Sequence, residues 1–452
     1  MGSKRAADVE FIRSECVRHQ KRLNDRIRTD KADLFLDIPH PSGRGSLPVG
    51  RDAYDAFDRL AELATREGKL TGRVDIVTIR TPLIDAFVRI FLAGGEPVSE
   101  KAIGRMMRDA VRVANTGLKD QTFFLPCHLS TQPSDHDIEI GPVRFIGRRK
   151  GSAIFRKALL TYRRDEPEEY RQDRPFILTV MRYYRGFRWF AEVTVERADG
   201  NRSEALARQA VSSALDCLQL IIGARNSQRM RIGGLASHYE RSAVLSLSPT
   251  GRPSYTSTTS YLGEVSLPDD WPTQLQDGEE ADGCRRAGHA VAQILTAEAE
   301  HAIARRFLDA AQWFGEAVRD GSPSTRIIKF VTAIERLVLT GRFEDVADSV
   351  SDRVAALVTG LIEGQDFAQN KAAFKRVYGV RSELVHGSIS PSSAKVKQSL
   401  RLAADFAEYS LLRALHNWPA ISAQRAKGEA ELHRWYEDLV SWVRDRAPGT
   451  GA

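Results

Sequence analysis

The sequence predicts a mainly helical α+β protein, in which an N-terminal region containing β-hairpins precedes an all-helical C-terminal bundle. Apolar residues recur at helical spacing in the first hundred residues, for example over 52–67. Between 123 and 196 they alternate with polar residues, as in half-buried strands. From 286 the helical spacing returns and continues almost to the end, which is typical of a helical bundle. We therefore expect three regions: 1–120, 121–285 and 286–452.

The composition is that of a globular protein with more than one domain. A chain of 452 residues exceeds the usual size of a single hydrophobic core. With 42% hydrophobic and 28% charged residues, it resembles neither a disordered nor a fibrous protein. The net charge of +7 and the pI of about 9.2 favour a polyanionic partner, but scattered arginines on an ordinary surface give the same values.

The four cysteines, Cys16, Cys127, Cys217 and Cys284, lack paired spacing and predict reduced thiols in a cytoplasmic protein. The N-terminus shows no signal-peptide pattern, and the most apolar stretch, 83–93, is charged and too short to span a bilayer. We expect no membrane partner.

No metal and no cofactor are expected. Cys127, His128 and His136 lack the spacing of a zinc site.

The N-terminal region is expected to be helical, with a proline- and glycine-rich loop over 39–48. The helices are predicted at 6–29, 52–67, 80–93 and 98–113.

The middle region is expected to form two β-hairpins and one helix. Strands at 138–140 and 143–145 flank the turn Gly141-Pro142. A second hairpin pairs 176–180 with a return strand at 189–195, and a helix follows over 203–222. Residues 223–285 are predicted to be irregular, with one or two edge strands and a domain boundary near 285.

The tip of the second hairpin carries Arg182, Arg185 and Arg188 among aromatic residues. Basic and aromatic side chains in alternation suit the stacking of single-stranded RNA. The same alternation also predicts that the aromatic residues belong to the core.

The C-terminal region is expected to be a bundle of helices separated by serine- and proline-containing breaks. The helices are predicted at 287–319, 327–338, 346–362, 367–386, 394–417 and 428–443.

The fourth of these helices ends in the candidate catalytic residues Arg381, Ser382 and His386, followed by Gly387 at a C-cap position. Histidine transfers protons near neutral pH, and arginine stabilises charge on phosphate oxygens, so the pair serves phosphodiester chemistry without a metal. The spacing itself is not specific, since Arg13 and His19 form a similar pair. The structural alternative is a plain helix cap, with Arg381 paired to Glu383.

The wider context resembles the HEPN superfamily and, within it, the ApeA-like branch of prokaryotic defence proteins. The likeness rests on Tyr378, on Arg381-Ser382 and on Leu384 to Gly387, in a helical bundle over about 300–418. A second helix carries Glu335, which is expected to orient Arg381 or to pair with Arg336 or Lys329. Tyr378 and Glu335 are supporting residues in this interpretation.

The resemblance implies a homodimer, or a higher homo-oligomer, with a composite active site. Ser382 and His386 share a helix face, but Arg381 lies about 140° away from His386 around the helix. A second copy of the helix would bring both kinds of residue to one cleft. RNA would be cut by attack of its own 2′-hydroxyl, leaving a 2′,3′-cyclic phosphate. His386 would transfer protons, Arg381 would stabilise the transition state, and Ser382 would position His386 or a phosphate oxygen.

The function implied is a metal-independent endoribonuclease of anti-phage defence that causes abortive infection. The N-terminal region would act as sensor or regulator, with a phage-derived or antitoxin trigger. Two alternatives remain open: a non-catalytic dimerisation module that binds nucleotide or RNA as an adaptor, and the toxin of a toxin–antitoxin pair.

Overall fold

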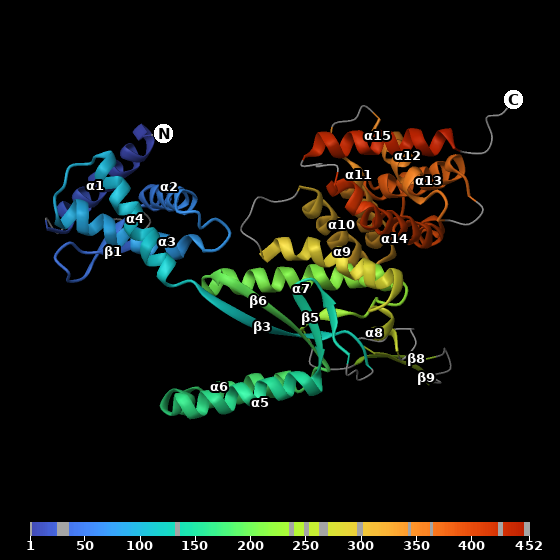
Figure 1. The fold of residues 1–452 in the computed structure, drawn as a ribbon, viewed down its shortest axis with the longest axis horizontal. Coiled ribbons are helices and arrows are strands. Elements are labelled where there is room, and N and C mark those ends of the chain that lie inside the picture. Colours follow the sequence, from blue (N-terminus) through green and yellow to red (C-terminus); the bar gives the residue numbers. More distant parts are fainter. Residues whose placement is uncertain are drawn as a thin grey trace. The chain divides into compact units, whose positions relative to one another are not determined.

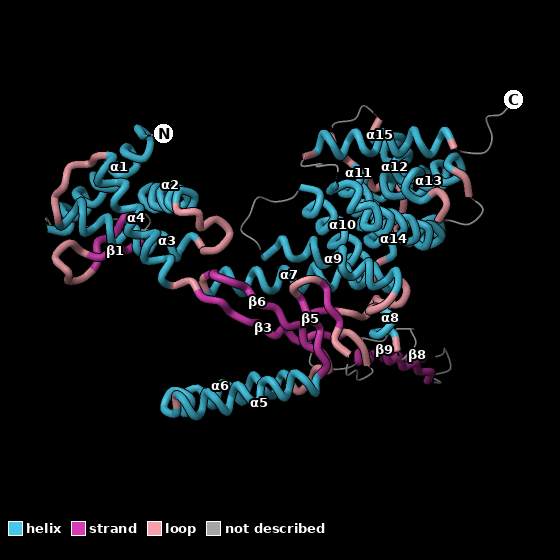
Figure 2. The backbone as a smooth tube through the Cα atoms, viewed as in Figure 1, coloured by secondary structure: helices cyan, strands magenta, loops and turns pink. Residues whose placement is uncertain are grey.

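The computed structural model describes ten segments of the chain: 2–24, 36–131, 136–234, 239–247, 253–261, 270–295, 302–341, 345–361, 365–423 and 428–446. Their elements are mostly helices together with a small sheet, which confirms a mainly helical α+β protein (Figure 1, Figure 2). Two compact units are present. The first combines Met1–Gln121 with Val195–Leu206, and the second combines Thr122–Thr194 with Ala207–Ala452.

The first unit is helical around one apolar core that includes Phe57, Phe87 and Met106. Its elements are α1 (Gly2–Asn24), β1 (Leu36–Pro39), β2 (Ser46–Val49), α2 (Arg51–Glu67), α3 (Ile76–Phe87), the π-helical turn η2 (Val88–Ala93) and α4 (Glu100–Thr116). All four predicted helices are present, although the end of the first, 25–29, lies outside the described residues. The predicted loop contains more order than expected, because β1 and β2 pair as an antiparallel ribbon.

The second unit contains a five-stranded sheet with the order β4-β5-β6-β3-β7. The strands are β3 (Lys119–His128), β4 (Ile138–Ile140), β5 (Val143–Gly147), β6 (Trp189–Ala198) and β7 (Arg231–Ile232). The predicted hairpin around Gly141 is confirmed, with Ile140 paired to Val143. The strand predicted after 189 is β6, and the helix predicted after 203 is α7 (Gly200–Ile222).

The predicted strand at 176–180 is wrong, because these residues belong to a helix. Two helices, α5 (Arg148–Asp165) and α6 (Pro167–Tyr184), stand between β5 and β6. β6 pairs antiparallel with β5 instead, from Val143 opposite Val193 to Gly147 opposite Trp189. Pro167 in the first turn, followed by Glu168 and Glu169, starts α6 as a helix. A short run with four apolar residues in five is compatible with either structure.

The expected boundary near 285 falls inside a helix. Residues 239–261 include an antiparallel hairpin, β8 (Tyr239–Leu247) with β9 (Pro253–Tyr261), and α8 (Trp271–Gln274) follows it. Helix α9 (Gly278–Leu295) then runs through residue 285, within the second unit. The predicted helix 287–319 is two helices, since α10 (Ala302–Arg319) is separate and 296–301 lie outside the described residues.

The bundle continues after α10 with helices close to their predicted places. They are α11 (Pro323–Val338), α12 (Val346–Val358), α13 (Phe367–Val385), α14 (Ala394–Ala423) and α15 (Glu429–Asp445). Buried aromatic rings pack between these helices. The ring centres of Phe314 on α10 and Phe330 on α11 are 5.6 Å apart, and those of Phe374 on α13 and Phe406 on α14 are 5.3 Å apart. A buried ion pair joins α10 to α7, with Arg319 2.7 Å from Asp216, and burial raises the pKa of Asp216 to about 7.

Within the described residues, no helix combines the length and the apolarity that crossing a membrane requires.

A glycine-to-glycine contact fixes α9 against the β4–β5 turn. A Cβ atom at Gly288 would lie 2.3 Å from the backbone nitrogen of Gly141. Gly141 also has a φ of +59°, which disfavours any other residue. The two backbones approach this closely only because neither residue has a side chain.

We therefore expect Gly288→Ala to lower the free energy of unfolding by about 2 kcal/mol or more, since backbone must move. The matched control is Gly283→Ala on the same helix, where the new Cβ would lie 3.6 Å from Ile221, an ordinary contact. That variant should be neutral or gain up to about 1 kcal/mol in helix propensity. Tryptophan fluorescence during urea unfolding measures both, because all six tryptophans lie in the second unit. Equal stability of the two variants would contradict the contact.

Candidate functional site

Helix α13, which carries the candidate catalytic residues, is defined at both ends by its own sequence. At its start, Asp366 and Gln369 form a reciprocal capping box, with hydrogen bonds of 2.8 and 3.0 Å. Its buried stripe includes Phe374, Val377 and Val380, which face the bundle. Arg381 follows Val377 by four residues and lies near this stripe, whereas His386 follows Val377 by nine and lies on the opposite side of the helix.

The end of α13 is a Schellman motif that places His386. Gly387 adopts a φ of +70°, and its N–H donates to the carbonyl of Leu384 at 3.2 Å. The N–H of Ser388 donates to the carbonyl of Glu383 at 2.8 Å. The predicted C-cap glycine is confirmed. His386 is the last residue before the turn, and its side chain is exposed.

Glu335 on α11 makes two hydrogen bonds to α13. One carboxylate oxygen accepts from the hydroxyl of Tyr378 at 2.8 Å, and the other accepts from Nη2 of Arg381 at 2.6 Å. The side chain of Glu335 is 13% exposed and that of Arg381 is 24% exposed, so this ion pair is largely shielded from water. This ion pair therefore contributes more to stability than a typical exposed ion pair does. The guanidinium carbon of Arg381 also lies 5.7 Å from the centre of the Tyr378 ring.

The other ion-pair partners considered for Arg381 and Glu335 are paired with different residues. Glu383 pairs with Lys395 at 2.7 Å rather than with Arg381. Arg336 pairs with Asp309 at 2.6 Å, and Lys329 pairs with Asp320 at 2.9 Å. Of the contacts considered for Glu335, the one to Arg381 is present.

The environment of Tyr378 makes it a donor rather than a base. Burial and the hydrogen bond to Glu335 raise the pKa of Tyr378 to about 12. The phenol therefore stays protonated at neutral pH and donates to the carboxylate.

Arg381 and His386 lie at the same end of α13 but are directed differently. Arg381 is turned towards α11, where its Nε is buried without a hydrogen bond among the described residues. His386 is exposed, and no hydrogen bond or ion pair between the two is found in the described chain. Ser382 is half-buried, and its carbonyl accepts from the N–H of His386 at 3.0 Å. One chain therefore brings Arg381, Tyr378 and Glu335 together but leaves His386 apart.

The predicted RNA-binding hairpin tip does not exist as a hairpin. Arg182 lies in the last turn of α6, and Arg185 is the residue that caps it. Arg188 lies between α6 and β6 and donates to the carbonyl of Thr131. All three side chains are exposed, but they belong to the junction of a helix and a strand.

The four cysteines are free and buried. Burial raises the pKa of the thiols of Cys16, Cys127 and Cys284 to about 12, so these thiols remain protonated. In the described part of the chain, no group of three or more His, Cys, Asp or Glu side chains is arranged to hold a metal ion.

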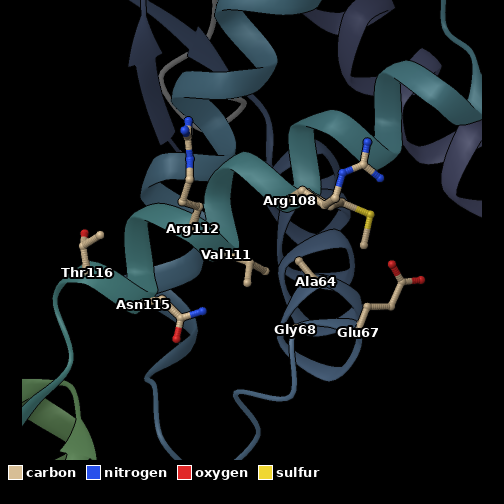
Figure 3. A pocket seen from close by; sticks show the side chains of 9 residues that line it. Ala64, Glu67, Gly68, Arg108, Val111, Arg112, Asn115 and Thr116 are labelled. Carbon is tan, nitrogen blue, oxygen red and sulfur yellow. The ribbon is translucent and has the colours of Figure 1, made fainter.

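The sequence did not predict a hollow of about 660 Å³ between α2 and α4 in the first unit (Figure 3). Ala64, Gly68 and Val111 form an apolar part of its lining, while Arg108 and Arg112 lie on α4 beside it. Helices α2 and α4 both have their C-terminal ends here. The partial negative charge of these helix ends would repel an anion that the arginines attract. The hollow shares no residue with the end of α13.

Comparison with known proteins identifies no relative: no family model, no curated protein and no solved structure matches this chain.

Because Gly387 holds the turn that presents His386, we expect Gly387→Ala to destabilise the second unit by about 1–2 kcal/mol, the cost of a left-handed residue with a Cβ. Gly379→Ala on the same helix is the control, since apart from its own helix backbone no atom of the described residues lies within 4 Å of its new Cβ. It should stabilise by up to about 1 kcal/mol. Tryptophan fluorescence during urea unfolding distinguishes the two, and a neutral Gly387→Ala would contradict this geometry.

Proposed function

We propose that the second unit is a metal-independent endoribonuclease of the HEPN type, with Arg381, Ser382 and His386 at its active site. The sequence resemblance at 378–387 is the starting point. The observation that carries the proposal is the arrangement of α13: Arg381 is held by Glu335, and His386 is exposed at a helix end one turn away. The fold thus positions the side chain of Arg381, as a catalytic group needs, and leaves His386 exposed to a ligand.

In this mechanism His386 exchanges protons with the 2′-hydroxyl or the leaving 5′-oxygen. Arg381 stabilises the negative charge that develops on the phosphate oxygens. Glu335 and Tyr378 act as positioning residues in this mechanism, because both contact Arg381. Glu335 binds Nη2 of the guanidinium and Nε is buried, so Nη1 is the group left for a phosphate.

The active site is completed by a second copy of the chain. His386 does not meet Arg381 within one chain, so a two-fold pairing of α13 supplies the missing group. Val385, next to His386, is 53% exposed and offers an apolar side chain for such a contact. The assembly is a homodimer, or a larger homo-oligomer built from it.

The biological role is anti-phage defence by abortive infection, with the first unit as sensor or regulator. This part of the proposal rests on the resemblance, which also implies a phage-derived or antitoxin trigger. A non-catalytic adaptor with the same bundle would bind RNA without cutting it, so a cleavage assay separates the two functions.

The decisive assay incubates the purified full-length protein with labelled RNA in EDTA. We expect cleavage that leaves a 2′,3′-cyclic phosphate, and a loss of about 100-fold or more in Arg381→Ala and in His386→Ala. The matched controls are Arg376→Ala, exposed on the same helix, and His289→Ala, exposed on α9. Both should cleave like the parent protein. A requirement for Mg²⁺, or full activity of the Arg381 and His386 variants, would refute the mechanism.

A further inference from the structure

Helices α5 and α6 form an antiparallel pair, the arm (residues 148–185), inserted between two neighbouring strands of the sheet (Figure 1). Aromatic contacts fix its root. Phe155 lies 5.2 Å from Phe190, and Tyr184 stacks on Phe190 at 5.4 Å. The hydroxyl of Tyr184 donates to the carbonyl of Phe124 at 2.6 Å. The arm is therefore firmly attached to the sheet.

Beyond its root the arm contributes almost nothing to a core. Helix α6 has no buried residue, and the one buried residue of α5 is Gly151, at the root. The large apolar side chains Leu160, Phe176 and Leu178 are 57%, 74% and 51% exposed. Two helices of this length that bury so little serve to present a surface rather than to stabilise the fold.

The arm holds nearly all the net positive charge of the protein. It has eleven Arg and Lys residues against five Asp and Glu, a net charge of +6, while the whole chain carries +7. Along α5, seven basic residues from Arg148 to Arg164 precede the first acidic one, Asp165. The basic character of the chain is thus concentrated in the arm and not evenly scattered.

Several of these basic residues lie on one face of α5. Arg156, Lys157 and Arg164 line a hollow of about 640 Å³ together with Leu160 and Thr161. Their spacing of three, four, seven and eight residues places them on the same side of the helix. Arg164 pairs with its neighbour Asp165, at 2.7 Å. Within the described residues, Arg156 and Lys157 form no ion pair and are available to a ligand.

We propose that the arm binds the phosphate backbone of a nucleic acid along α5. A helix of 18 residues is about 27 Å long. Duplex DNA carries one phosphate charge per roughly 1.7 Å of its axis, so a helix of this length laid along the duplex faces many phosphates. Arginine and lysine contacts of this kind bind without reading sequence. A membrane surface suits this face less well, because Leu160 is its one large apolar side chain and interfacial helices bury a broad apolar face.

This surface is separate from the end of α13 and does not depend on the nuclease assignment. If the protein cuts RNA, the arm captures the substrate. If it does not, the arm still binds nucleic acid.

The test is fluorescence anisotropy with the full-length protein in a His386→Ala background, so that RNA stays intact. The probes are single-stranded RNA, duplex RNA and duplex DNA of about 20 nucleotides per strand, long enough to cover α5. The variant Arg156→Glu, Lys157→Glu, Arg164→Glu changes the net charge of the arm from +6 to zero. We expect the Kd to rise about tenfold or more, and the salt dependence of binding to fall by about two to three released ions.

The matched control reverses the same number of charges on the first unit, at the exposed residues Lys21, Arg66 and Lys101. It should shift the Kd much less than the arm variant does. Comparing the three probes shows whether RNA, DNA or both are bound. Equal effects of the arm and control variants would overturn the proposal. So would an arm variant that loses binding to phosphatidylserine vesicles while keeping its affinity for all three nucleic acids. Circular dichroism checks that both variants are folded.

Discussion

The geometry of the proposed site depends on one carboxylate, Glu335, which joins α11 to α13. Its two oxygens take separate donors, the hydroxyl of Tyr378 and the guanidinium of Arg381. Arg381 is mostly shielded from water, so without Glu335 its charge would lack the ion pair seen here, at a cost of about 1–3 kcal/mol. The same interaction sets the direction of the guanidinium. A single contact therefore stabilises the bundle and positions the candidate catalytic arginine.

Helix α11 is in turn held at its C-terminal end by two buried arginines. Arg353 donates to the carbonyl of Val338 at 2.6 Å, and Arg306 donates to that of Arg336 at 2.8 Å. Each also pairs with a glutamate of α15: Arg353 with Glu437, and Arg306 with Glu429. Positive charge at a helix C-terminus is favourable, and the glutamates neutralise it. Through these two arginines, α15 stabilises the position of α11, and Glu335 of α11 in turn binds Arg381.

Sequence periodicity predicted most helices, because this signal is local; of the two caps of α13, Gly387 was predicted from the sequence and the Asp366 box was missed. The Asp366 box and Gly387 define α13 within its own residues. The Glu335–Arg381 contact was one of several alternatives, since its residues are 46 apart and only packing selects among Arg336, Lys329 and Arg381. The prediction failed at 176–180, where α6 buries nothing and its apolar residues therefore follow no core-facing pattern. The run of basic residues in α5 was visible in the sequence, but its exposure on an arm was not.

In the proposed active site, Arg381 of one copy of the chain acts together with His386 of another. Mixing inactive Arg381→Ala protein with inactive His386→Ala protein tests it, because no chain in the mixture then carries both residues. After subunit exchange, the measurement is RNA cleavage in EDTA. We expect the mixture to regain activity that neither variant has alone. A mixture as inactive as its components, with exchange shown by mass spectrometry, would contradict a composite site.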